Sequence, residues 1–119
     1  MILAEVSVPA PCVMLNSNVR SHRHAAAKLT KQWRMAAKIA ARQVPTPDLP
    51  KPVRVMAYVW KARANHYDVC NLYPTIKACL DGAVDAGWLL DDDFMHVLGP
   101  DMRHGGVGDP RIVFKFVTV

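Results

Sequence analysis

The chain has 119 residues, of which 51% are hydrophobic and 21% are charged. This length and composition are those of one globular domain with a single modest core. No apolar run of the sequence approaches the roughly 18 residues of a membrane span, and the first residues lack the features of a signal peptide. We therefore expect a cytoplasmic protein with no membrane partner. The three cysteines form no C-x-x-C pair, which indicates neither a disulfide framework nor a zinc site.

The net charge of +5 is distributed unevenly along the chain. Residues 1–67 hold 11 Lys and Arg against two acidic residues, a net +9, whereas residues 68–119 hold four against eight, a net −4. A basic half is typical of proteins that bind a polyanion such as DNA, and the acidic half suggests a separate site. The alternative explanation of this asymmetry is that the charges of the two halves neutralise each other within the fold or across a dimer.

The N-terminal half begins with a loosely alternating segment, residues 2–8, which predicts a strand. After a polar loop, Ser21 is a suitable N-cap for a long helix over residues 22–42. One face of this helix is apolar, with Leu29, Trp33, Ala36 and Ala40 in helical spacing. The opposite face and its flanks carry the cations Lys28, Lys31, Arg34, Lys38 and Arg42. We expect Lys28, Lys31 and Lys38 to contact DNA phosphates, with simple solvation as the alternative.

Four prolines between Gln43 and Pro52 predict an extended connection. Residues 53–61 are β-branched, aromatic and apolar, which predicts a largely buried strand. A second helix is predicted from Pro74, near its start, to Gly87, which follows its end. Its buried face has the i, i+3, i+4, i+7, i+8 spacing of Ile76, Cys79, Leu80, Ala83 and Val84.

The C-terminal part predicts a short strand at residues 96–98, a loop over residues 99–110 because that segment has four glycines, and a final strand at residues 112–119. The order of these elements predicts an α+β fold, a single domain over residues 1–119 in which two main helices pack on a mixed β-sheet.

Carboxylates cluster in the second half of the chain. Five of the ten acidic residues lie between Asp81 and Asp93, and Asp68 precedes them. Carboxylates in an otherwise basic protein suggest a divalent metal ion held where a polyanion binds. That combination is the chemistry of a nuclease.

Residues 68–93 resemble the signature of the RusA-like Holliday junction resolvases. The matching motifs are Asp68-x-x-Asn71-Leu72, Lys77-Ala78-x-Leu80-Asp81-Gly82, Asp85-Ala86-Gly87-Trp88-Leu89 and Asp91-Asp92. The Asn16-Ser17-Asn18 loop and the final strand also fit, and residues 99–106 look like the branch found in phages of actinobacteria. The resemblance implies a homodimeric, Mg²⁺-dependent endodeoxyribonuclease, with Mn²⁺ as a substitute, that resolves four-way junctions and other branched DNA. Its setting would be recombination, repair or phage DNA processing in a bacterial host cell.

The resemblance also implies roles for individual residues. Asp68, Asp91 and Asp92 match metal ligands, and Asp68, Lys77 and Asp92 match catalytic residues, Lys77 after allowing one inserted residue before it. The family has a second aspartate two residues after the first, and here that position is Cys70. A thiol is a poor ligand for Mg²⁺. Three outcomes stay open: Asp81, Asp91 or Asp93 supplies the missing oxygen, metal affinity is weak, or the protein binds branched DNA without cutting it.

Two further DNA contacts are expected. Asn71 is one of them, with capping of the helix or a hydrogen bond to Asp68 as its other expected roles. Arg103, between glycines in the predicted loop, is the other and is expected to reach a phosphate. The predicted helix of about 13 residues separates Asp68 from Asp92 by roughly 20 Å. The two carboxylates can share a metal only if residues 91–93 fold back or a second subunit contributes.

Overall fold

The computed structural model of the chain describes residues 1–19 and 23–119. In chain order its elements are β1 (Ile2–Pro9), α1 (Arg23–Arg42), β2 (Val53–Lys61), the 3₁₀-helix η1 (Val69–Leu72), α2 (Tyr73–Asp85), β3 (Val97–Val107) and β4 (Arg111–Val117). The predicted α+β class, with a mixed sheet and two main helices, is confirmed. Ser21, the expected N-cap of α1, lies outside the described residues.

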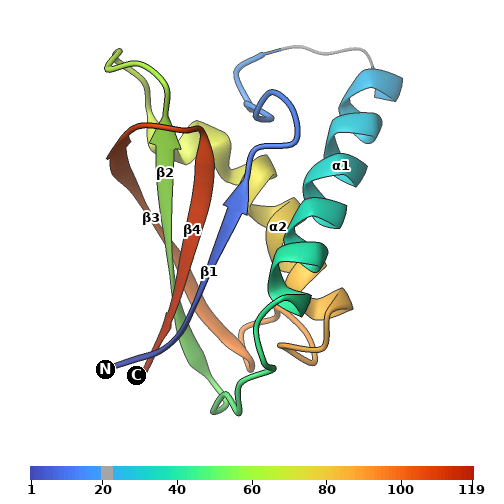
Figure 1. Cartoon of the computed structure of the whole chain (residues 1–119), viewed down its shortest axis with the longest axis vertical. Helices are drawn as coiled ribbons and strands as arrows, with labels where there is room; N and C mark the ends of the chain where they lie inside the picture. The colour runs from blue at the N-terminus through green and yellow to red at the C-terminus, as the bar shows by residue number, and fades with distance from the viewer. Residues whose placement is uncertain (20–22) are drawn as a thin grey trace.

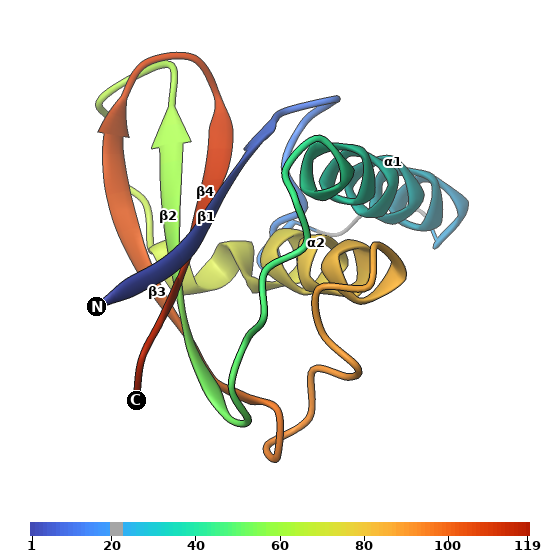
Figure 2. The same ribbon diagram turned by 60° about the horizontal axis from the view of Figure 1, so that its bottom comes forward.

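The four strands lie in the order β1-β4-β2-β3, so β1 and β3 are the edges. β2 and β3 are parallel and are joined through α2, while β4 pairs antiparallel with both β1 and β2. Both helices lie on the same side of this sheet (Figures 1 and 2). Alternate strand residues therefore point into the core, and those of β2 are Val53, Val55, Ala57 and Val59, all fully buried.

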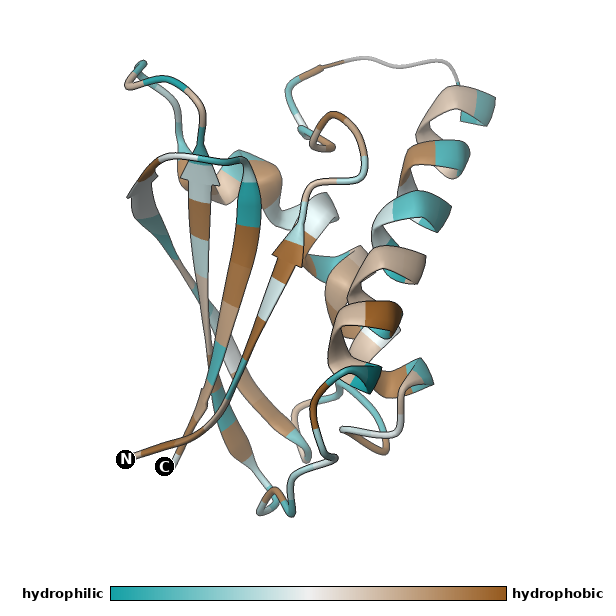
Figure 3. Cartoon of the chain, in the orientation of Figure 1, coloured by the Kyte–Doolittle hydropathy of each residue, from teal (hydrophilic) through white to brown (hydrophobic). Residues whose placement is uncertain are grey.

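Helix α1 packs through a face that is slightly rotated from the predicted one. Its buried residues are Trp33, Ala37, Ala40 and Ala41, and Leu29 and Ala36 are only partly buried. The opposite side is not purely basic, because Met35 and Ile39 are about half exposed between the cations. Figure 3 shows this mixture of hydrophilic and hydrophobic segments along the helix.

Helix α2 follows the prediction closely. Ile76, Cys79, Leu80 and Ala83 are buried. Gly87 adopts a φ of 85°, and the amides of Gly87 and Trp88 donate to the carbonyls of Val84 and Ala83, each at 3.0 Å. These two bonds form a Schellman motif, which ends the helix at the expected glycine. No helix in the described part of the chain is both long and apolar enough to cross a bilayer.

The prediction of a loop over residues 99–110 is wrong. β3 continues to Val107 and pairs with β2 along its whole length, with two irregularities in register. Gly105 and Gly106 do not interrupt the strand, and the Trp60 side chain lies against both. A Cβ on Gly105 or Gly106 would come within 2.6 Å of the indole. Trp60 itself lies on the open face of the sheet, where the Arg111 guanidinium is 4.1 Å from its ring centroid.

Candidate functional site

Lys77, in the second turn of α2, joins two carboxylates from different parts of the chain. Its Nζ donates to Asp81 Oδ1 at 3.0 Å, one helical turn further on, and makes a short hydrogen bond to Asp92 Oδ2. Asp92 belongs to the segment between α2 and β3, so this segment folds back along the helix. We call Lys77, Asp81 and Asp92 the Lys77 cluster.

The Lys77 cluster carries an excess of negative charge, because one ammonium faces two carboxylates. The hydrogen bond from Lys77 holds the pKa of Asp92 below its usual range, although partial burial opposes this. Burial lowers the pKa of Lys77, but the hydrogen bonds to Asp92 and Asp81 outweigh it and raise the pKa. Asp91 is exposed beside them, and its Oδ1 accepts the Asp92 amide at 2.7 Å. A phosphate would approach this cluster only if a further cation offset the charge.

Asp68 has a structural contact of its own. Its Oδ1 accepts the amide of Cys70 at 3.0 Å, which makes Asp68 the N-cap of η1. The capping of α2 expected of the Asn71 side chain is not found: Leu72 is the N-cap of α2, and no side chain of the described residues caps that helix. Asn71 instead links segments through its backbone, since its amide donates to Asp68 O at 3.0 Å and its carbonyl accepts the Ser17 amide at 2.8 Å.

Asp68 also lines a surface hollow of about 580 Å³. We call it the Asp68 hollow; its lining residues are Ala64, Asn65, His66, Tyr67, Asp68, Val69 and His104. The Tyr67 hydroxyl makes a short hydrogen bond with His104 Nδ1, and their rings meet edge to face at 5.5 Å. No sequence pattern predicts His104 at this hollow. An extension of the predicted strand at residues 96–98 along β2 would place it there, because His104 pairs with Val59 near the end of β2.

Magnesium is the metal that the resemblance implies. No three His, Cys, Asp or Glu side chains in residues 1–19 and 23–119 are grouped as ligands for a metal ion. Asp68, Asp91 and Asp92 therefore do not form a three-ligand set. Asp93 is engaged elsewhere, because its Oδ1 lies 2.5 Å from His96 Nδ1 and this contact holds the pKa of Asp93 down. Mg²⁺ is often bound by one or two carboxylates together with water and substrate phosphates, and the oxygens of Asp91 and Asp92 suit that mode.

The expected DNA contacts lie in different surroundings. Lys28 and Lys31 are exposed on α1. Lys38 is half-buried, and its charge is among those that lower the pKa of Asp85, after the hydrogen bond from Arg34. Arg103 lies on β3 rather than in a loop, and Asp101 accepts its two hydrogen bonds at 3.2 and 3.3 Å.

The two charged halves of the chain neutralise each other at one point. The Arg34 guanidinium donates two hydrogen bonds to Asp85, at 2.6 and 2.9 Å, and so joins α1 to the end of α2. The alternative explanation of the charge asymmetry, neutralisation within the fold, therefore accounts for part of it.

Comparison of the chain with protein-family models and with curated proteins finds no match.

Proposed function

We propose that this protein is a Mg²⁺-dependent endodeoxyribonuclease of the RusA-like kind, which hydrolyses phosphodiester bonds at four-way junctions and other branched DNA. The observation that carries the proposal is the contact between Lys77 and Asp92. It joins two residues that the resemblance marks as catalytic, although 14 residues separate them in the sequence.

The residues of the Lys77 cluster have distinct tasks in this proposal. The Lys77 ammonium is a point charge that stabilises the phosphoryl group as negative charge develops on it. Asp92 and Asp81 hold that ammonium in place. When bound, Mg²⁺ neutralises the phosphate and activates a water molecule. Asp91 and Asp92 offer it oxygen ligands, and Asp68 is the third carboxylate expected near the bound DNA.

We also propose that the active form is a homodimer. Two equivalent sites related by a two-fold axis suit a four-way junction, which has two strands to be cut. Light scattering coupled to gel filtration should give about twice the chain mass of 13.2 kDa. A mass equal to that of one chain, with junction cleavage retained, would contradict the dimer.

The nuclease proposal is tested with a synthetic four-way junction in Mg²⁺ or Mn²⁺. We expect cleavage by the wild type and a loss on the order of 10²–10³ in rate for Asp92→Asn and Lys77→Met, the cost of removing one preorganised charge from such a site. Asp48→Asn is the matched control, because Asp48 is exposed in the proline-rich connection. No cleavage by the wild type, or full cleavage by Asp92→Asn, refutes the proposal.

A second candidate is a protein that binds branched DNA without cutting it. Two observations favour it: Cys70 stands where the family has an aspartate, and no three-ligand metal group exists among the described residues. This candidate predicts junction binding in EDTA and no nicks when Mg²⁺ or Mn²⁺ is added. Nicks that depend on the metal ion would exclude it.

A further inference from the structure

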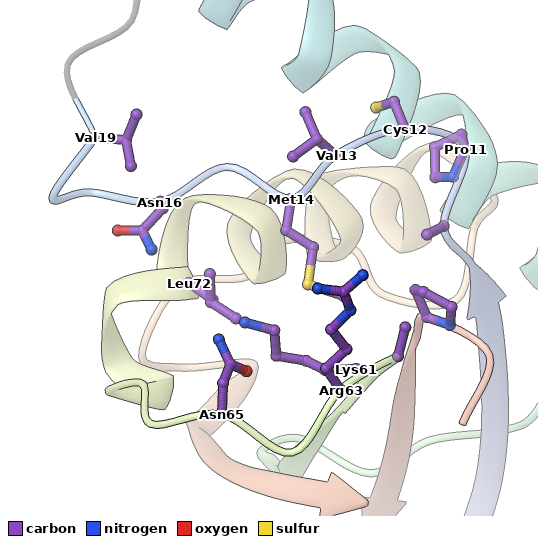
Figure 4. A pocket seen from close by; sticks show the side chains of 13 residues that line it. Pro11, Cys12, Val13, Met14, Asn16, Val19, Lys61, Arg63, Asn65 and Leu72 are labelled. Carbon is purple, nitrogen blue, oxygen red and sulfur yellow. The ribbon is translucent and has the colours of Figure 1, made fainter. Parts of the chain in front are cut away.

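A second cavity of about 580 Å³ lies between the segment after β1 and the loop after β2 (Figure 4). We call it the Arg63 pocket. Its lining residues are Ala10, Pro11, Cys12, Val13, Met14, Asn16, Val19, Lys61, Ala62, Arg63, Asn65, Leu72 and Pro110. None of these residues is acidic, two are cations, and most of the others are apolar.

The wall formed by residues 10–19 is held by hydrogen bonds to both helices and to η1. The Trp33 indole donates to the Val13 carbonyl at 3.0 Å, and the Thr75 hydroxyl donates to the Leu15 carbonyl at 2.8 Å. The Ser17 amide donates to the Asn71 carbonyl. These bonds fix the apolar side of the pocket before any ligand arrives.

The opposite side of the pocket carries its polar groups. Figure 4 shows the side chains of Lys61, Arg63 and Asn65 extending from the end of β2 toward Met14 and Leu72. No carboxylate of the described residues forms an ion pair with Lys61 or Arg63. The Lys61 ammonium lies 4.3 Å from the centroid of the Tyr67 ring, a contact that does not neutralise its charge. Both charges are therefore available to an anionic ligand.

We propose that the Arg63 pocket takes one unstacked nucleotide of a DNA strand. The planar guanidinium of Arg63 and the apolar side chain of Met14 suit the faces of a base, while Leu72, which is buried, lines the pocket from the core. The amides of Asn16 and Asn65 offer donors and acceptors to its edge, and Lys61 suits the adjoining phosphate. The inference rests on the proposed function, because a branch point is where a duplex presents unpaired bases.

The position of the pocket agrees with this ligand. Asn65 lines both the Arg63 pocket and the Asp68 hollow, so the two are adjacent. On the other side, Pro11 lines both the pocket and a shallow depression that includes Lys31 of α1. A strand held by α1 would pass the Arg63 pocket before it reaches Asp68.

The test uses 2-aminopurine, a base whose fluorescence rises when it leaves the stack. It is placed at the branch point of a four-way junction and, separately, within a short single-stranded oligonucleotide, both in EDTA so that nothing is cut. We expect the bound wild type to change the fluorescence of both. Arg63→Met should abolish the change and weaken single-strand binding about tenfold, the loss of one stacking contact. Arg54→Met, a matched exposed cation on β2, should behave as the wild type.

The outcomes separate the pocket from the nuclease proposal. An Arg63-dependent fluorescence change with no cleavage in Mg²⁺ upholds the pocket and refutes the nuclease. Metal-dependent cleavage without a fluorescence change upholds the nuclease proposal and refutes the pocket. Equal behaviour of Arg63→Met and Arg54→Met, or no binding of the single strand, overturns the pocket.

Discussion

At the scale of single residues, Asp92 links the stability of the fold to pH. Its pKa is lowered in the folded state by the hydrogen bond from Lys77. Stability from such a group is present above the unfolded pKa of about 3.9 and is lost as the pH falls through the folded pKa. The raised pKa of Lys77 acts at the other end, so its contribution is present below about pH 10.4 and is lost as the pH rises through the folded value.

The Asp92→Asn variant tests this linkage. We expect it to lower the free energy of unfolding by about 1 kcal/mol at neutral pH, a small value because the Lys77 side chain is 43% exposed and solvent screens the pair. In urea titrations the difference from the wild type should stay constant between about pH 5 and pH 9 and shrink below about pH 4. A difference that persists undiminished at pH 3 would show that the carboxylate charge is not its source.

Cys70 is the residue at which this chain departs from the RusA-like pattern that it resembles. It is exposed, and only its backbone amide is held, by Asp68. An aspartate there adds an oxygen ligand beside Asp68 without disturbing the core. At a limiting Mg²⁺ concentration we expect Cys70→Asp to cut a four-way junction about tenfold faster, from tighter metal binding. Cys70→Ser is the control that changes size little and adds no charge. An equal gain in both variants would contradict a metal effect.

At the scale of elements, α1 and α2 touch closely at Gly82. A Cβ built on Gly82 would lie 2.4 Å from the Arg34 carbonyl oxygen and 2.8 Å from the Ala37 Cβ. Gly82→Ala should therefore cost about 2–3 kcal/mol of stability by forcing the helices apart, although alanine favours an isolated helix by about 1 kcal/mol.

Chemical denaturation of Gly82→Ala, with Gly108→Ala as the control variant, measures this cost. A Cβ on Gly108 meets no atom closer than 3.6 Å, so its replacement should change stability by less than about 0.5 kcal/mol. Equal stability of Gly82→Ala and the wild type would mean that the helices do not cross as closely as described.

The elements also show what the sequence could and could not predict. α2 was predictable because its apolar spacing, Pro74 and Gly87 are local signals that agree with one another. β3 was not, because two of its glycines, Gly105 and Gly106, are covered by Trp60 of the neighbouring strand, a tertiary contact that the sequence pattern does not specify. Propensity alone favours a loop there, and the tertiary contact overrides it. The Lys77–Asp92 contact depends on the path of residues 86–96, which no local pattern specifies.

At the scale of the whole molecule, four cations that form no ion pair with the described residues lie at one end, whereas Lys51, also without an ion pair, lies at the other. The first turns of α1, the segment after β1 and the loop after β2 all lie at the same end in Figure 1. Lys28 and Lys31 lie on α1, Lys61 is the last residue of β2, and Arg63 lies in the loop after it. None of the four forms an ion pair with the described part of the chain. This end is the side on which we expect DNA to bind.

The salt dependence of junction binding tests whether each lysine at this end contacts a DNA phosphate. The logarithm of the binding constant should fall linearly with the logarithm of salt concentration, and each phosphate contact adds about 0.9 to the slope for duplex arms. Lys28→Gln and Lys31→Gln should each reduce the slope by about that amount. Lys38→Gln should reduce it less, because Lys38 lies in the field of Asp85.

The measurement is fluorescence anisotropy of a labelled junction over a series of NaCl concentrations in EDTA. Lys51→Gln, in the proline-rich connection before β2, is the matched control and should leave the slope unchanged, because that connection lies at the opposite end of the molecule (Figure 1). If Lys51→Gln lowers the slope as much as Lys31→Gln does, DNA binds to no particular end, and the path from α1 past the Arg63 pocket to Asp68 is refuted with it.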